Sequence, residues 1–346
     1  MAGGEREERA GVPLSNLDQP IFKDAGATKR GLVDYLDAVA GRIVPELADR
    51  PLSVVRVHRG GEPFMQKNLP KYTPEWVRSV SLWAETSQRQ VTYALCNDRR
   101  TLVWFANQRA IEYHPTLMRA GEWDKPTYLV MDLDPPAGET FDLAVRAAHL
   151  VREALNDAGL DGAVKTSGAK GVHVFVPIAG VAADDAAAAT RAIAARAERI
   201  DPSFATTAFI REDREGKVFL DSTRAGGATV VAAYSPRLRP GTPVSFPLAW
   251  NELDGVRPGD FTLHTALERL GDADPWAETM PAPQRLPADL VEEGHGIPIA
   301  RVQAMHEGKR RKRAREKEAA RDKEAAGGTD PARDEKRADG GEDSGG

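Results

Sequence analysis

The sequence predicts an α/β fold, more closely an α+β core in which helices pack against one mixed β-sheet. Two long segments with helical periodicity, residues 140–157 and 184–200, alternate with short apolar runs that are typical of buried strands. This order of strand, helix, strand, helix and further strands suits a sheet covered by helices. A chain of 346 residues is long enough to bury such a core, as one large domain or two smaller ones.

One helical segment and several short strands are expected in the first part of the chain. Residues 29–44 place their apolar side chains on one side of a helix, namely Leu32, Val33, Leu36, Val39, Ala40 and Ile43. Strand-like runs follow at residues 52–57, 90–95 and 101–106. Residues 1–12 are charged and contain glycine, so we expect them to be disordered.

Both long segments are expected to be helices that pack against the sheet. Thr140 can cap the first helix, whose inward-facing side chains are Ala144, Ala147, Leu150, Val151, Ala154 and Leu155. The second helix is rich in alanine. Residues 301–346 are highly charged and almost free of large apolar residues, so they cannot bury enough surface to offset the entropy of ordering. We expect this tail to be largely disordered.

Charge and cysteine content limit the partners and the compartment. The chain has 47 Lys and Arg residues against 52 Asp and Glu residues, a net charge of −5. Since non-specific DNA affinity comes mostly from neutralising phosphates, any DNA contact is expected to be local and salt-sensitive. The single cysteine, Cys96, offers neither a disulfide framework nor a cysteine zinc site. With no apolar signal core and no apolar run of about 18 residues, the sequence predicts a cytoplasmic protein without a membrane segment.

A first sequence patch, MDLDPP at residues 131–136, is typical of a metal site. Residues 128–131 predict a buried strand, and Asp132 and Asp134 follow at positions i and i+2, so both carboxylates point to one face of extended chain. Repulsion between two adjacent carboxylates raises the pKa of one of them unless a cation lies between them. Hard divalent ions take such oxygen ligands. Taken alone, the same pattern also fits a turn with two solvated acids.

A second patch, SGAKGVH at residues 167–173, predicts a turn followed by a half-buried strand. Glycines in the turn, Gly168 among them, let backbone N–H groups approach an anion, and Lys170 can neutralise phosphate charge. Ser167 can add a hydroxyl donor. The spacing of a Walker A loop is missing. A β-turn with a chance lysine fits the turn alone, and His173 alone fits a satisfied core histidine.

A third patch, KVFLDSTR at residues 217–224, predicts a short strand that ends in Asp221. A further strand is expected at residues 229–234, followed by Ser235-Pro236-Arg237. Asp221 can serve as a third metal carboxylate, and Arg237 can present a fixed guanidinium to a triphosphate. An acid at the end of a strand is a weak signal on its own.

In this order and spacing, the three patches resemble the polymerase domain of bacterial ligase D, the ATP-dependent ligase of non-homologous end joining, in the archaeo-eukaryotic primase superfamily. The resemblance is continuous over residues 14–270 and includes TKRGLVDYLDAVA, QKNLP, IEYHP and AYSPRLRPGTPVSFPLAWNEL. It implies a primase-polymerase domain at residues 13–300. That domain would contain an N-terminal subdomain (13–120), a core with a distorted RNA-recognition-like sheet (121–270) and a C-terminal extension (271–300).

The resemblance also implies roles for single residues. Asp132, Asp134 and Asp221 match catalytic aspartates that hold two Mn²⁺ or Mg²⁺ ions, with Mn²⁺ preferred, and Asp221 would help to activate the primer 3′-hydroxyl. The residues that match nucleotide-binding positions are Ser167, Gly168, Lys170, His173, Arg237 and His114. The residues that match DNA-binding positions are Lys29, Arg56, Phe64 and Lys67, with Lys29 matching a lysine that recognises a downstream 5′-phosphate.

The chain departs from the family pattern at three places. Thr223-Arg224 stands where a Gln-Asn pair is usual, and Gln19 stands where a second 5′-phosphate lysine is expected. Phe64-Met65 replaces two consecutive aromatic residues that stack on the template. These changes concern recognition of DNA ends more than the chemistry.

The resemblance therefore implies a nucleotidyltransferase that adds nucleotides, including ribonucleotides, to primer 3′ ends of DNA at gaps or broken ends. Its expected partners are primer-template DNA, nucleoside triphosphates, Ku and a separate ATP-dependent DNA ligase, with the polymerase standing alone as a monomer. Three alternatives stay open: a primase that initiates without a primer, an end-binding accessory protein with weakened catalysis, and a metal-dependent phosphodiesterase.

Overall fold

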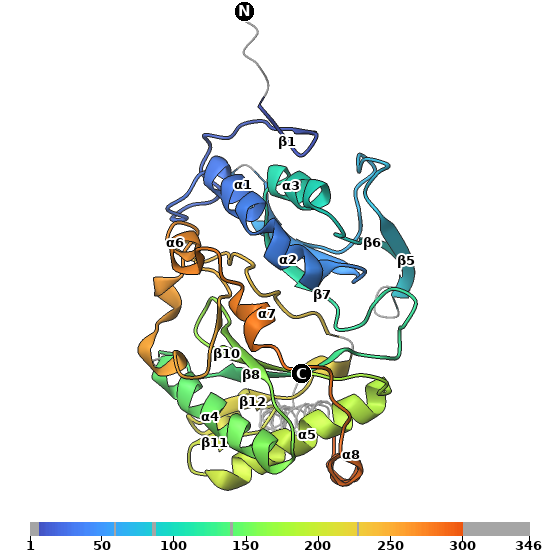
Figure 1. Ribbon diagram of the computed structural model, residues 1–346, viewed down its shortest axis with the longest axis vertical. Coiled ribbons are helices and arrows are strands. Elements are labelled where there is room, and N and C mark those ends of the chain that lie inside the picture. The colour runs from blue at the N-terminus through green and yellow to red at the C-terminus, as the bar shows by residue number, and fades with distance from the viewer. Residues whose placement is uncertain (1–6, 59, 85–87, 139–140, 227, 300–346) are drawn as a thin grey trace, which may run out of the picture. The chain divides into compact units, whose positions relative to one another are not determined.

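The computed structural model describes residues 7–58, 60–84, 88–138, 141–226 and 228–299. These residues belong almost entirely to one compact unit, Met1–Pro298. Two large β-sheets organise the described part of this unit, one in the upper half of Figure 1 and one in the lower half. No helix in the described ranges is both long enough and apolar enough to span a bilayer.

The lower sheet has six strands in the order β11-β12-β8-β10-β9-β13. Their bounds are Ala205–Thr206, Val218–Asp221, Tyr128–Asp134, Val172–Pro177, Ala163–Thr166 and Pro247–Leu248. The β11–β12 pair is parallel and the other pairs are antiparallel, so the sheet is mixed, as the sequence predicts. Strand β10 is buried along its whole length, and β8 is buried except at Tyr128, Asp132 and Asp134, which are partly exposed. The core therefore lies between this sheet and its helices.

Helices α4 (Phe141–Asp157) and α5 (Ala183–Ile200) pack against each other and against the strands of the lower sheet (Figure 1). Their small apolar faces allow the close approach that covers the core. Helix α8 (Ala288–Gly296) packs closely on α5: a Cβ atom on Gly294 would lie 1.9 Å from the Ala188 carbonyl oxygen. Only glycine fits at this helix crossing.

The upper sheet has five strands in the order β4-β3-β6-β5, with β7 paired to β3. The strands are β3 (Leu52–Val57), β4 (Pro63–Gln66), β5 (Ser79–Ala84), β6 (Arg89–Ala94) and β7 (Ala110–Pro115). The remaining elements are α1 (Lys29–Ala38), α2 (Ala40–Leu47), α3 (Arg99–Asn107), α6 (Ala266–Leu270), α7 (Pro275–Thr279), and the 3₁₀ turns η1 (Arg211–Arg214), η2 (Arg224–Gly226), η3 (Leu253–Gly255) and η4 (Pro258–Asp260).

Three expectations about elements were wrong. Residues 101–106 are helical within α3, because the Asp98 side chain caps the helix by accepting from Thr101 N at 2.7 Å. The helix expected at residues 29–44 is two helices that meet at Val39. Residues 229–234 do not form a regular strand; their backbone follows β7 through irregular hydrogen bonds such as Ala232 N to Tyr113 O.

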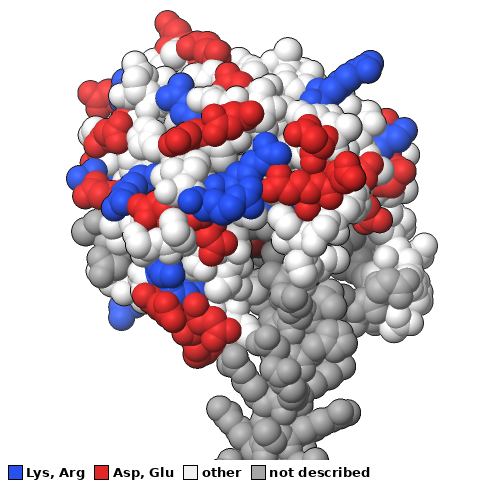
Figure 2. Space-filling view, turned by 90° about the horizontal axis from the view of Figure 1, so that it is seen from below, with Lys and Arg blue, Asp and Glu red and all other residues white. Residues whose placement is uncertain are grey.

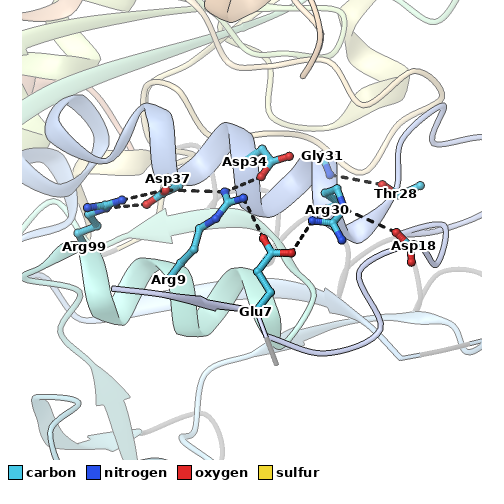
Figure 3. Close-up of polar contacts among 9 residues, drawn as sticks. All are labelled: Glu7, Arg9, Asp18, Thr28, Arg30, Gly31, Asp34, Asp37 and Arg99. Carbon is cyan, nitrogen blue, oxygen red and sulfur yellow. Dashed lines mark hydrogen bonds and ion pairs between the residues drawn. The ribbon is translucent and has the colours of Figure 1, made fainter. Parts of the chain in front are cut away.

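The segment expected to be disordered at the N-terminus is ordered over residues 7–12. Strands β1 (Glu8–Arg9) and β2 (Val12–Pro13) form a hairpin. Figure 3 shows how its charges reach α1: Arg9 pairs with Asp34 at 2.5 Å, and Glu7 accepts from Arg30 at 2.6 Å. These ion pairs join the hairpin to α1. Residues 1–6, the tail at 301–346 and the expected Thr140 cap lie outside the described residues.

Candidate active site

Strand pairing brings the three predicted aspartates together. In the sheet, Asp132 on β8 lies opposite His173 on β10 and opposite Asp221 on β12. Asp134 is two residues further along β8. Since side chains two apart share a face, and directly opposite residues on neighbouring strands share a face as well, all four side chains project from one side of the sheet. The register of three strands therefore builds an acidic cluster from residues far apart in the sequence.

An open cleft of about 540 Å³ adjoins this cluster. The residues that line it are Asp132, Asp134, Ser167, Gly168, Ala169, Lys170, His173, Arg237, Arg239, Pro243, Pro258 and Gly259. Carboxylates thus share the cleft with the turn of the second patch and with two arginines. The sequence predicts most of this set; Arg239 was missed, although it lies two residues after Arg237 in the same SPRLRP segment.

The turn of the second patch is closed by its own hydroxyl group. Ser167 Oγ accepts from Ala169 N at 3.2 Å and from Gly171 N at 3.1 Å. Gly168 has φ +67°, and a Cβ atom there would lie 2.6 Å from Arg237 Cγ and 2.8 Å from Ser245 N. Glycine is required at this position for two reasons, the left-handed backbone and the close passage of Arg237.

The basic side chains of the cleft are held by protein oxygens. Lys170 Nζ donates to the Pro135 carbonyl at 2.6 Å, next to the end of β8. Arg237 donates to the Ser167 carbonyl. Both cations are therefore positioned beside the turn, where an anion that accepted from them would replace a backbone oxygen.

Glu112, which the sequence did not single out, fixes two predicted nucleotide-site residues. Its carboxylate pairs with Arg237 Nε at 3.1 Å, lies 2.8 Å from His114 Nε2, and accepts from Leu238 N at 2.8 Å. Burial alone would raise the pKa of Glu112, but the hydrogen bond with His114 and the charge of Arg237 lower it to about 2. The charged residue in IEYHP, two positions before His114, was the available signal.

Lys165 is a second residue that the sequence did not single out. It is fully buried on β9 opposite His173, with Nζ 2.8 Å from His173 Nδ1 and 2.6 Å from Ser245 Oγ. Burial lowers the pKa of Lys165 well below its usual value, but the amine can donate an N–H to Nδ1 in either charge state. This donation leaves the proton of a neutral His173 on Nε2, 3.2 Å from Asp132 Oδ1. Burial and the charge of Lys165 lower the pKa of His173 to about 4. The sequence signal for this residue was a lysine within the short strand AVKT, whose other residues suit a buried strand.

The aspartates differ in their electrostatic surroundings. Burial alone would raise the pKa of Asp132, but the His173 ring and the Arg224 guanidinium lower it. Burial and the charges of Asp132 and Asp221 raise the pKa of Asp134, while Lys170 acts in the opposite direction. The excess of negative charge at Asp134 is the condition that a bound cation would relieve.

Oxygen donors of this kind fit a hard divalent cation. In the conformation seen, however, no three Asp, Glu, His or Cys side chains of the described residues are grouped closely enough to hold a metal ion. Arg224 lies between two of the acids instead, with Nη2 2.7 Å from Asp132 Oδ2 and 3.1 Å from Asp221 Oδ2.

The four predicted DNA-binding residues lie in the other half of the protein. Lys29 on α1 is only 3% exposed and donates to the Ser15 carbonyl at 2.5 Å. Arg56 on β3 is 5% exposed, lies opposite Phe64 on β4, and donates to the Gln108 carbonyl at 2.9 Å. Of the four, Lys67 alone is exposed. None of them is among the described residues that line the cleft.

The fold is that of a primase-polymerase domain. Residues 28–276 match the family model described as LigD, primase-polymerase domain, and the chain belongs to this family.

Individual relatives agree. Over 276 residues the chain is 33% identical to the multifunctional non-homologous end joining protein LigD of Mycolicibacterium smegmatis, which covers 78% of this chain and 36% of that protein. It is 31% identical over 265 residues to the bifunctional non-homologous end joining protein LigD of Bacillus subtilis, covering 75% of this chain and 42% of that protein. The chain therefore spans less than half the length of these relatives.

A solved structure shows the same fold. The polymerase domain of Mycobacterium tuberculosis ligase D, in complex with DNA, superposes with a TM-score of 0.71 at 30% sequence identity, covering 80% of this chain and all of that domain. This match confirms the predicted fold class, an α+β primase-like core with a mixed sheet flanked by helices.

Proposed function

We propose that this protein is a nucleotidyltransferase that extends primer 3′ ends on DNA, at gaps or broken ends, in non-homologous end joining. The observation that carries the proposal is the register of β12, β8 and β10, which gathers Asp132, Asp134 and Asp221 beside a cleft lined by basic groups. Family membership supports the same class of activity. The relatives are named for non-homologous end joining.

In the proposed reaction the three aspartates would hold divalent ions, Mn²⁺ or Mg²⁺. When bound, such ions stabilise negative charge on the attacking and leaving oxygens of a phosphoryl transfer. Asp221 lies at the end of β12 and would accept a hydrogen bond from the primer 3′-hydroxyl. The buried neighbours Lys165 and His173 would keep Asp132 oriented, because each fixes the next through one hydrogen bond.

The cleft's basic side would bind the triphosphate. Ser167 would offer its hydroxyl, Lys170 its ammonium group and Arg237 a planar guanidinium suited to two phosphate oxygens. Glu112 would keep Arg237 pointed along the cleft. Binding would replace the carbonyl oxygens that now accept from Lys170 and Arg237, so the substrate exchanges neutral partners for charged ones.

DNA would approach from the half that carries Lys67 and Phe64. The face seen from below in Figure 2 has acidic and basic side chains interspersed over its described part. An interspersed face of this kind does not attract a phosphate backbone. We therefore assign DNA binding to a local surface in the half that carries Lys67 and Phe64. The proposed protein partners are Ku and a separate ligase. The enzyme is proposed to be monomeric and cytoplasmic.

A primer-extension assay tests the proposal. Wild-type protein, labelled primer-template DNA, MnCl₂ and either ribo- or deoxynucleoside triphosphates are incubated beside Asp132→Ala. Extension by wild type and its loss in the variant is the expected result, and the better triphosphate identifies the preferred sugar. Absence of extension by a folded, DNA-binding wild-type protein would contradict the proposal and favour an end-binding accessory role.

A further inference from the structure

Arg224 lies inside the acidic cluster. It follows Asp221 by three residues at the start of η2, and its Nη2 atom makes ion pairs with both Asp132 Oδ2 and Asp221 Oδ2. Nearby charges raise the pKa of Arg224 even though burial opposes this. A permanent positive charge thus bridges the two acids that face each other across β8 and β12.

The other oxygens of these two acids also have protein partners. Asp132 Oδ1 faces His173 Nε2, and Asp221 Oδ1 accepts from the backbone and side chain of Thr223 at 2.8 and 2.6 Å. A divalent ion needs carboxylate oxygens at about 2.0–2.6 Å. It cannot bind both Oδ2 atoms while a guanidinium nitrogen lies between them, in agreement with the absence of a ready-made metal cluster among the described residues.

Arg224 is held in a way that permits release. Its side chain is 32% exposed, so it reaches the acids from the solvent edge. Both ion pairs come from the same nitrogen, and its buried Nε has no hydrogen-bond partner within the described part of the chain. Rotation about the side-chain torsions would free both carboxylates without moving a strand.

We propose that Arg224 is a built-in counter-cation that competes with the divalent ion for Asp132 and Asp221. It neutralises the cluster when metal is absent, and it must leave before metal binds, so it weakens the affinity of the site for metal. This inference rests on the proposed function, because it takes the three aspartates to be the metal site.

The test is isothermal titration of the metal-free protein with MnCl₂, without nucleotide or DNA. Arg224→Gln removes the competing charge and should bind Mn²⁺ about tenfold more tightly than wild type. Arg269→Gln is the matched control: it removes the same charge from a surface pair with Glu252, neither of which lines the cleft, and should bind as wild type does. Equal or weaker binding by Arg224→Gln would overturn the inference.

A second variant and a thermal unfolding measurement show whether a change in Mn²⁺ binding comes from misfolding. Arg224→Lys keeps the charge but loses the Nη2 atom that pairs with both acids, and it should bind Mn²⁺ more tightly than wild type by a smaller factor than Arg224→Gln. In EDTA, thermal unfolding should start at lower temperature for Arg224→Gln, and added MnCl₂ should raise its Tm more than that of wild type. A smaller Mn²⁺-induced rise in Arg224→Gln than in wild type would contradict competition.

A third variant, Asp134→Ala, distinguishes failure of the proposed metal site from failure of the competition by Arg224. Asp134→Ala should lose Mn²⁺ binding in both the wild-type and the Arg224→Gln background. If Asp134→Ala bound Mn²⁺ as wild type does, the metal site itself would be wrong and the inference would fall with it. If Asp134→Ala lost binding and Arg224→Gln gained none, the site would stand and only the competition would be refuted.

Discussion

The two large sheets, with the helices beside them, differ in where the predicted site residues lie. In the lower sheet, strand register brings Asp132, His173 and Asp221 side by side at an open cleft. In the upper half, Lys29 and Arg56 are buried and engaged with backbone carbonyls, and Lys67 is exposed. The difference teaches that the proposed catalytic groups are placed by backbone pairing, whereas the groups expected to contact DNA depend on which side chains remain exposed.

The sharpest test of the lower sheet is Asp134→Ala. Asp134 projects from the same face of β8 as Asp132 and lines the cleft. Loss of its carboxylate should therefore weaken binding of the proposed cation that stabilises the transition state and lower the extension rate by at least about a thousandfold. Primer extension measures this, and circular dichroism should show an unchanged fold. Residual activity within tenfold of wild type would remove Asp134 from the chemistry.

A smaller loss is expected from the basic side of the cleft. Arg237→Ala removes a guanidinium that Glu112 fixes, and should lower kcat/KM for the triphosphate by about 10- to 100-fold, roughly the effect of one or two charge-assisted hydrogen bonds. Steady-state kinetics with varied nucleotide provide the measurement. Arg269→Ala, whose partner Glu252 is not among the cleft-lining residues, is the control and should behave as wild type.

The burial of Lys29 predicts a dependence of stability on pH. Burial and the charge of Arg109 lower the pKa of Lys29 from its usual 10.5 to about 8. Between these values the unfolded chain holds a proton that the folded protein has released, so stability should rise with pH in this window. Relative to Lys29→Met, which does not titrate, wild type should gain up to about 3 kcal/mol between pH 8 and 10.5.

Urea denaturation of both proteins at several pH values in this window measures the gain. If the difference in unfolding free energy between wild type and Lys29→Met stayed constant with pH, Lys29 would be solvated and free to bind a 5′-phosphate. The contrast between the open cleft at the lower sheet and the buried cations of the upper half would then weaken.

The smallest effect belongs to Lys67. As an exposed charge just after β4, it should contribute about one phosphate contact. Lys67→Ala should weaken DNA binding a few-fold at low salt and make the dependence of affinity on salt shallower by about one unit. Fluorescence anisotropy at several NaCl concentrations gives both values. An unchanged salt slope would place the DNA path elsewhere, whereas a loss as large as that of Asp134→Ala would break the comparison.

Prediction from the sequence succeeded where local pattern decides the outcome. Alternation placed Asp132 and Asp134 on one face of a strand, and helical periodicity located α4 and α5. It failed at residues 101–106, since a short apolar run fits either a helix or a strand and the Asp98 cap decides between them. It also failed at residues 7–12, where ion pairs to α1 order a charged segment.

By itself, the sequence determined the fold class and the family, because these depend on periodicity and on the order and spacing of short motifs along the chain. It also named Asp132, Asp134 and Asp221 as candidate site residues. Only the tertiary structure decided the state of the charges: Arg224 bridging Asp132 and Asp221, Lys165 behind His173, and Lys29 turned inward. The physical reason is that the cost of a charge depends on burial and on partners within a few ångströms. Those partners come from distant parts of the chain, as with Asp132 and Arg224, which are 92 residues apart.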